Sequence, residues 1–143
     1  MPDPQELLPL VRVLLRAGVR FTLGGSGLLL SLGLVDRVGD WDLTTDAPLE
    51  RVEAALQGWQ AARVAGGRPP YASNYVLRVA LPGAAARDAE LIGGFTLQTE
   101  RGTCTLPTVG SFRWHGVPVG SPEVWAVAYR LMNRTQRAEL LSA

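Results

Sequence analysis

The sequence predicts an α/β or α+β domain in which helices and strands interleave along the chain. Segments with apolar residues at helical spacing alternate with segments that read as strands, as expected for a sheet covered by helices. A glycine turn at Gly24 and Gly25 joins one such strand to a short apolar segment. Of the 143 residues, 47% are hydrophobic, which is enough to bury the core of a single domain spanning residues 1–143.

The first predicted element is a helix that begins at Pro4 and ends at Gly18. Asp3 can cap this helix, and Glu6, three positions later, can complete a capping box. The elements predicted next are a strand over 20–23, the turn Gly24, Gly25 and Ser26, a brief buried helix over 28–32 and a strand over 40–45.

The strand over 40–45 has one apolar and one polar face. Trp41 and Leu43 lie on one side, and Asp40, Asp42 and Thr44 lie on the other, because side chains alternate along a strand. The acidic face is the feature that calls for a functional explanation, although a solvated edge strand could also carry it.

The second half continues with a helix that Pro48 opens. The elements predicted after it are a loop over 65–70, strands over 75–81 and 89–95, a less regular β region over 104–119, and a closing helix capped by Ser121 and started by Pro122. The sequence does not reveal the order of the strands in the sheet.

Composition excludes several chemistries. The chain has no lysine, which rules out Schiff-base catalysis and a P-loop lysine, and its single cysteine, Cys104, rules out an internal disulfide and multi-cysteine zinc sites. His115 is the only histidine, so a histidine-rich metal site is impossible. The abundant ionisable groups are arginines and carboxylates, and oxygen ligands suit Mg²⁺ or Mn²⁺.

Charge and hydropathy point to no membrane or nucleic-acid partner. The formal net charge is +1, and the charged residues are scattered along the chain. The longest apolar run, residues 28–35, is much shorter than the roughly 20 residues needed to cross a bilayer. The N-terminus does not read as a secretory signal, so we expect a cytoplasmic location.

The segment from Gly24 to Asp42 carries groups that suit phosphate chemistry. Gly24 and Gly25 let the backbone approach a phosphate, and the hydroxyl of Ser26 can donate to it. Asp40 and Asp42 project on the same side of a strand, roughly 6 to 7 Å apart at the backbone, and can clamp one or two divalent cations. A nucleoside triphosphate with Mg²⁺ is the ligand that this combination favours.

This pattern resembles the nucleotidyltransferase superfamily. Its signature is a glycine, glycine or serine turn followed, after about a dozen residues, by Asp, hydrophobic, Asp; here 13 residues separate Ser26 from Asp40 in the run DWD. The match is most similar to the small standalone and aminoglycoside- or lincosamide-type branch, in which an arginine precedes the acidic pair, as Arg37 does. The resemblance implies a mixed β-sheet flanked by helices, and transfer of a nucleoside monophosphate from NTP to a hydroxyl-type acceptor.

The resemblance also implies a third carboxylate on a later strand, which helps to bind metal and deprotonates the acceptor. Glu90 is the candidate for this role and Asp88 the competing choice; the family more often has aspartate there. Arg37 is expected either to reach a phosphate or to pair with Asp36 or Asp40. Arg130 stands where related proteins frequently carry lysine.

Two other motifs fit this sequence less well, and a different function is compatible with the same fold. A dinucleotide fingerprint lacks its third glycine, which Leu30 replaces, and a Cys104–His115 dyad has no obvious orienting acid. The alternative function is an inactive or weakly active binding module with this fold, which works through a protein partner as in toxin and antitoxin pairs. A homodimer or a helical protein partner is a further expectation, because the chain is small and rich in apolar residues.

Overall fold

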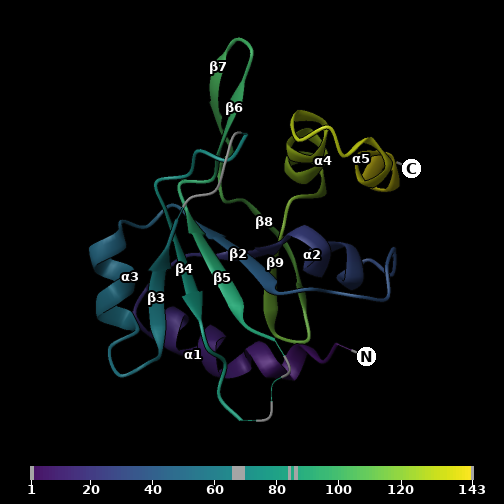
Figure 1. Ribbon diagram of the computed structural model, residues 1–143. Helices are drawn as coiled ribbons and strands as arrows, with labels where there is room; N and C mark the ends of the chain where they lie inside the picture. The colour runs from purple at the N-terminus through teal and green to yellow at the C-terminus, as the bar shows by residue number, and fades with distance from the viewer. Residues whose placement is uncertain (1, 66–69, 84, 86, 143) are drawn as a thin grey trace.

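The computed structural model describes residues 2–65, 70–83, 85 and 87–142, and its main feature is a seven-stranded sheet (Figure 1). The helices are the 3₁₀-helix η1 (Pro4–Leu7), α1 (Leu8–Arg16), α2 (Gly25–Ser31), α3 (Leu49–Ala55), α4 (Pro122–Leu131) and α5 (Thr135–Ser142). The strands are β1 (Thr22–Gly24), β2 (Trp41–Thr45), β3 (Ala61–Val64), β4 (Tyr75–Val79), β5 (Ala89–Gly93), β6 (Thr96–Thr99), β7 (Gly102–Thr105), β8 (Gly110–Trp114) and β9 (Val117–Gly120).

The large sheet is mixed, with the strand order β3-β4-β5-β2-β1-β9-β8. Strand β2 is parallel to β5 and antiparallel to β1, and β1 is in turn parallel to β9. The remaining neighbours pair antiparallel, and β6 and β7 form a separate hairpin. An α+β fold with a mixed sheet flanked by helices is therefore confirmed.

The core lies between the apolar face of the central strands and the N-terminal helix. Leu10 and Leu14 of α1 are fully buried, as are Trp41 and Leu43 of β2 and Leu91 of β5. Figure 1 shows α4 and α5 next to each other, at the opposite end of the molecule from α1. Packing of the apolar face against α1 leaves the polar face of β2 free for another role.

The first helix departs from the prediction in its opening turn. Residues 4–7 form a 3₁₀-helix, in which the Asp3 carboxylate accepts a hydrogen bond from the N–H of Gln5, and no capping box forms. The Glu6 carboxylate instead accepts hydrogen bonds from the indole of Trp41 at 3.0 Å and from Arg87 at 2.8 Å. Glu6 therefore binds residues that are distant in sequence, and does not cap the helix as its local pattern predicts.

This interaction of Glu6 is expected to stabilise the fold. The Arg87 and Glu6 side chains are only 19% and 16% exposed, so Glu6→Ala leaves a poorly hydrated guanidinium and an indole N–H without their acceptor. We expect it to lower the free energy of unfolding by about 2 kcal/mol in urea denaturation. The control Glu53→Ala removes an exposed glutamate from α3; equal losses in the two variants would contradict the assignment.

Most other predicted elements are confirmed, with ends that coincide with the prediction or differ from it by up to four residues. The Ser121 hydroxyl caps α4 by accepting from the N–H of Val124, and Gly18 follows α1 with a φ of +71°. Three elements were not predicted: β3, β6 and α5. Residues 66–69 of the predicted 65–70 loop lie outside the described residues. Within the part of the chain that the structure describes, no helix combines the length and apolar character needed to cross a bilayer.

Candidate active site

The glycine turn between β1 and α2 lies directly against Asp42. Gly25 begins α2 with a φ of +57°, a backbone conformation that glycine tolerates best. A Cβ at Gly25 would lie 2.5 Å from Oδ2 of Asp42, and a Cβ at Gly24 would overlap the indole of Trp125. Both glycines are therefore required by close approach, and the Asp42 carboxylate points toward the turn.

Sheet register places four residues of neighbouring strands in one row. Asp42 of β2 pairs with Gly24 of β1 on one side and with Glu90 of β5 on the other. Glu90 is in turn opposite Arg78 of β4. Because residues paired across a sheet project on the same face, Asp42, Glu90 and Arg78 share one surface.

An ion pair connects Glu90 and Arg78 at one end of this row. Arg78 Nη2 lies 2.8 Å from Glu90 Oε1, and 3.9 Å from Oδ2 of Asp40. Asp40 precedes β2, and its Oδ1 accepts a hydrogen bond from the N–H of Asp88 at 3.3 Å. Arg78 is thus the counter-ion for Glu90 and, at a longer distance, for Asp40.

Asp42 has a strongly perturbed environment. Burial, together with the negative charges of Glu90 and Asp40, raises the pKa of Asp42 to about 7. The positive charges of Arg134 and Arg137 act in the opposite direction and are the smaller influence. A carboxyl that resists ionisation beside a second carboxylate is a frequent feature of catalytic and cation-binding sites.

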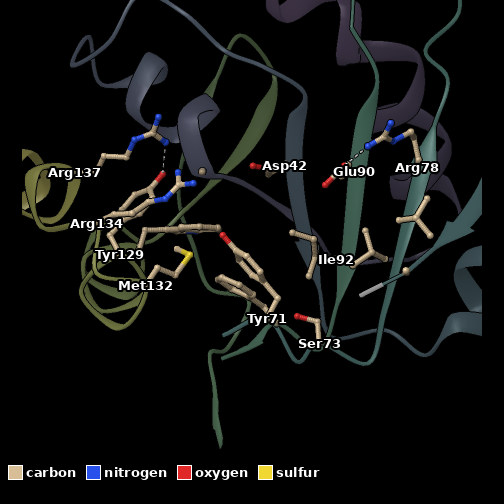
Figure 2. A pocket seen from close by; sticks show the side chains of 16 residues that line it. Asp42, Tyr71, Ser73, Arg78, Glu90, Ile92, Tyr129, Met132, Arg134 and Arg137 are labelled. Carbon is tan, nitrogen blue, oxygen red and sulfur yellow. Dashed lines mark hydrogen bonds and ion pairs between the residues drawn. The ribbon is translucent and has the colours of Figure 1, made fainter. Parts of the chain in front are cut away.

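Asp42 and Glu90 line a cavity of about 380 Å³ (Figure 2). One wall comes from the sheet, and the other comes from α4, α5 and the residues between them. Arg134 and Arg137 lie on this second wall, where Arg137 Nη1 donates to the hydroxyl of Tyr129 at 3.5 Å and its guanidinium lies 5.6 Å from the ring centroid. Two guanidinium groups therefore face the cavity from the side opposite the carboxylates.

The structure brings together some of the predicted site residues and separates others. The cavity is lined by Gly25, Asp42 and Glu90. Its lining does not include Gly24, Ser26 or Asp40, although each of these is close in sequence to a lining residue. Glu90, and not Asp88, reaches the cavity. Among the described residues, no three His, Cys, Asp or Glu side chains converge closely enough to hold a metal ion.

Two predicted arginines lie elsewhere. Arg37 is exposed, and within the described residues it forms no ion pair with Asp36 or Asp40. Arg130 donates to the hydroxyl of Ser142 on the exposed side of the helices. Neither residue lines the cavity.

The arginines that do face the cavity, Arg78, Arg134 and Arg137, were missed by sequence reasoning. Arg78 stands on a predicted strand, and alternation alone would have placed it on the face opposite Leu77 and Val79. Arg134 and Arg137 are three apart at the end of the chain, a spacing that puts both on one side of a helix. That spacing is the feature of the sequence that could have indicated a pair of arginines on one surface.

The alternative dyad is not formed. Cys104 belongs to β7 in the separate hairpin, whereas His115 lies in the tight turn between β8 and β9, where its φ is +51°. The His115 ring packs edge-on against Trp114, with 5.3 Å between centroids. No hydrogen bond joins Cys104 and His115 among the contacts of the described residues.

Comparison with solved structures identifies the fold. TM1012 from Thermotoga maritima, a provisionally assigned nucleotidyltransferase, superposes with a TM-score of 0.63 at 24% identity, over 99% of this chain and 93% of that one. ANT(2")-Ia, solved with adenylyl-2"-tobramycin, superposes with a TM-score of 0.60 at 13% identity, over 97% and 88% of the two chains. No family model matches the sequence, and no curated protein matches it. The chain therefore has a nucleotidyltransferase-like fold.

Proposed function

We propose that this protein is a divalent-metal-dependent nucleotidyltransferase, which moves a nucleoside monophosphate from an NTP to a hydroxyl-type acceptor. The observation that carries the proposal is the register of Asp42 beside Glu90, with the glycine turn on one side and Arg134 and Arg137 across the cavity. Carboxylates opposite guanidinium groups suit a ligand that presents both a metal ion and phosphates. The two structural neighbours support the same class of reaction.

Asp42 and Glu90 are the residues that would hold Mg²⁺ or Mn²⁺, with Asp40 as a third ligand. The donor set fits such a cation because it consists of oxygens only, and because Asp42, whose pKa is raised first by burial and then by the charges of Glu90 and Asp40, lies beside other carboxylates. When bound, the cation would neutralise charge on the triphosphate. Asp40 can join the other two only if its side chain leaves the N–H of Asp88.

The remaining residues would bind and orient the substrates. Gly25 and Ser26 would approach the phosphates through the backbone and the hydroxyl, while Arg134 and Arg137 would pair with phosphate oxygens. Glu90 would accept the proton of the acceptor hydroxyl as its oxygen bonds to the α-phosphorus. The bond from the α-phosphorus to the bridging oxygen then breaks, and pyrophosphate leaves.

A binding module that works through a protein partner is the second candidate. The observation in its favour is that Arg78 neutralises Glu90, while Asp40 is turned toward Asp88, so that the described residues assemble no set of three carboxylates. A scaffold of this kind would not need nucleotide. Nucleotide binding that depends on Mg²⁺ and on residues of the cavity therefore distinguishes the two candidates.

We expect Arg137→Gln to weaken binding of ATP with Mg²⁺ by about 10-fold or more in isothermal titration calorimetry, because it removes a charged donor to phosphate. The matched control is Arg130→Gln, the same change at an arginine of α4 that does not line the cavity and donates to Ser142. Equal affinities for both variants and the unmodified protein would remove Arg137 from the site. Absence of any ATP binding by the unmodified protein would favour the binding module.

A further inference from the structure

The surface next to Glu90 is apolar. On the same sheet face, one step along the strands from the row of Asp42, Glu90 and Arg78, register aligns Ile92 of β5 with Val76 of β4 and Val64 of β3. All three line the cavity, and together we call them the aliphatic floor. Tyr71, 42% exposed, borders the same cavity (Figure 2). A molecule whose hydroxyl reaches Glu90 would rest its body on this floor.

The ionisable groups around the cavity are mainly positive. Among the described residues three arginines line it, and of the chain's 13 Asp and Glu residues, all within the described part, Asp42 and Glu90 are the two that do. Glu90 is already paired with Arg78 at 2.8 Å, and Asp42 lies within the field of Arg134 and Arg137. If both carboxylates also bind a metal ion, neither is available for an ammonium group of the acceptor.

We propose that the acceptor is a hydroxyl compound with an apolar or aromatic body that is uncharged or anionic, and that polycations are excluded. The proposal rests on the proposed function, because Glu90 is taken as the residue that receives the acceptor proton. It separates this chain from its structural neighbour ANT(2")-Ia, whose bound product contains the polycation tobramycin. The fold is shared, but the charge of this cavity does not suit that kind of substrate.

The physical reason is the cost of placing an ammonium group in this environment. A cation that moves from water onto the aliphatic floor loses hydration, and a nearby unpaired carboxylate is the group that offsets such a loss most strongly. Arg78, which is paired with Glu90 and lines the same cavity, repels an ammonium group because both carry a positive charge. A neutral aromatic or aliphatic body instead gains free energy by covering Ile92, Val76 and Val64.

The test compares small phenols that share a 4-hydroxybenzyl group and differ in charge. Tyramine is a cation, tyrosol is neutral and 4-hydroxyphenylacetate is an anion. Protein-detected NMR follows the methyl groups of Ile92 and Val76 during titration of the full chain, with and without Mg²⁺ and a non-hydrolysable ATP analogue. We expect tyrosol and 4-hydroxyphenylacetate to bind at least about 10-fold more tightly than tyramine, and tobramycin to leave these methyl signals unchanged.

Several outcomes overturn the proposal. Tyramine binding as tightly as tyrosol overturns it, as does a tobramycin-induced shift of the floor signals. Absence of shifts with all three phenols does so equally, because it shows that the floor does not accept such a body. Failure of the ATP analogue to bind, with the order of the phenols preserved, instead counts against the proposed function alone.

A substitution tests the cause of the preference. Val76→Glu places a new carboxylate on the aliphatic floor at a half-buried position, and we expect it to shift the preference toward tyramine by about 10-fold. Val127→Glu makes the same change on the exposed side of α4, outside the cavity, and is expected to leave the order unchanged. Thermal unfolding checks that both variants fold. An unchanged order in folded Val76→Glu overturns the electrostatic explanation.

Discussion

Replacing Asp42 by asparagine is expected to lower nucleotidyl transfer by about 1,000-fold or more while leaving the fold intact. Asp42 is the carboxylate that touches the glycine turn and adjoins Glu90 in register, so it is the group best placed to hold a cation against the triphosphate. Asparagine has nearly the same shape but no negative charge. The expected loss is therefore one of cation binding and charge neutralisation, and not of packing.

Two measurements separate this role from a general loss of structure. Release of pyrophosphate from each of the four NTPs, in the presence of candidate acceptors, reports transfer, and Mn²⁺ binding followed by electron paramagnetic resonance reports the cation site directly. Asp36→Asn makes the same change at an exposed aspartate outside the cavity and should behave like the unmodified protein. Retention of both activity and Mn²⁺ affinity by Asp42→Asn would remove the catalytic proposal.

The strand that carries the acidic pair could be predicted because its information is local. Trp41 and Leu43 alternate with Asp40 and Asp42, and the apolar residues pack in the core while the acids face away from it. Strand neighbours could not be predicted, because the pairing of Asp42 with Glu90 depends on β5 crossing to lie parallel to β2. The resemblance to a family supplied Glu90, which sequence pattern alone could not place.

The arginines of the second wall, Arg134 and Arg137, could not be predicted as site residues, because their position depends on tertiary packing. Helix α5 has a weakly apolar sequence, TQRAELLS, in which only Ala138 is buried, so its apolar pattern does not predict that it packs beside a site. Its position follows from packing against α4, which is a tertiary property. Glu6 was misplaced for a similar reason, since its partners Trp41 and Arg87 are distant in sequence and outweigh a local cap.

The site is also expected to lower the stability of the protein above neutral pH. Burial raises the pKa of Asp42 from an ordinary value of 3.8 to about 7, so between these values the folded state binds a proton that the unfolded state has released. Stability contributed by this group is complete below the lower value and is lost as pH rises through the folded pKa. A shift of this size corresponds to a loss of roughly 2 to 4 kcal/mol by pH 8.

Asp42→Asn removes this loss, because the amide keeps the shape of the protonated carboxyl at every pH. We expect its unfolding temperature in EDTA to exceed that of the unmodified protein at pH 8 by roughly 5 to 10 °C, and the two to coincide near pH 4. Taking the difference between the two proteins cancels the titration of every other group. Replacing EDTA by Mn²⁺ at pH 8 should narrow the gap by stabilising only the unmodified protein, since a bound cation replaces the proton on Asp42. The contrary result is a difference in unfolding temperature between the variant and the unmodified protein that is the same at pH 8 as at pH 4. It would show that Asp42 ionises in the folded protein without penalty, and that neither burial nor neighbouring charge opposes its ionisation.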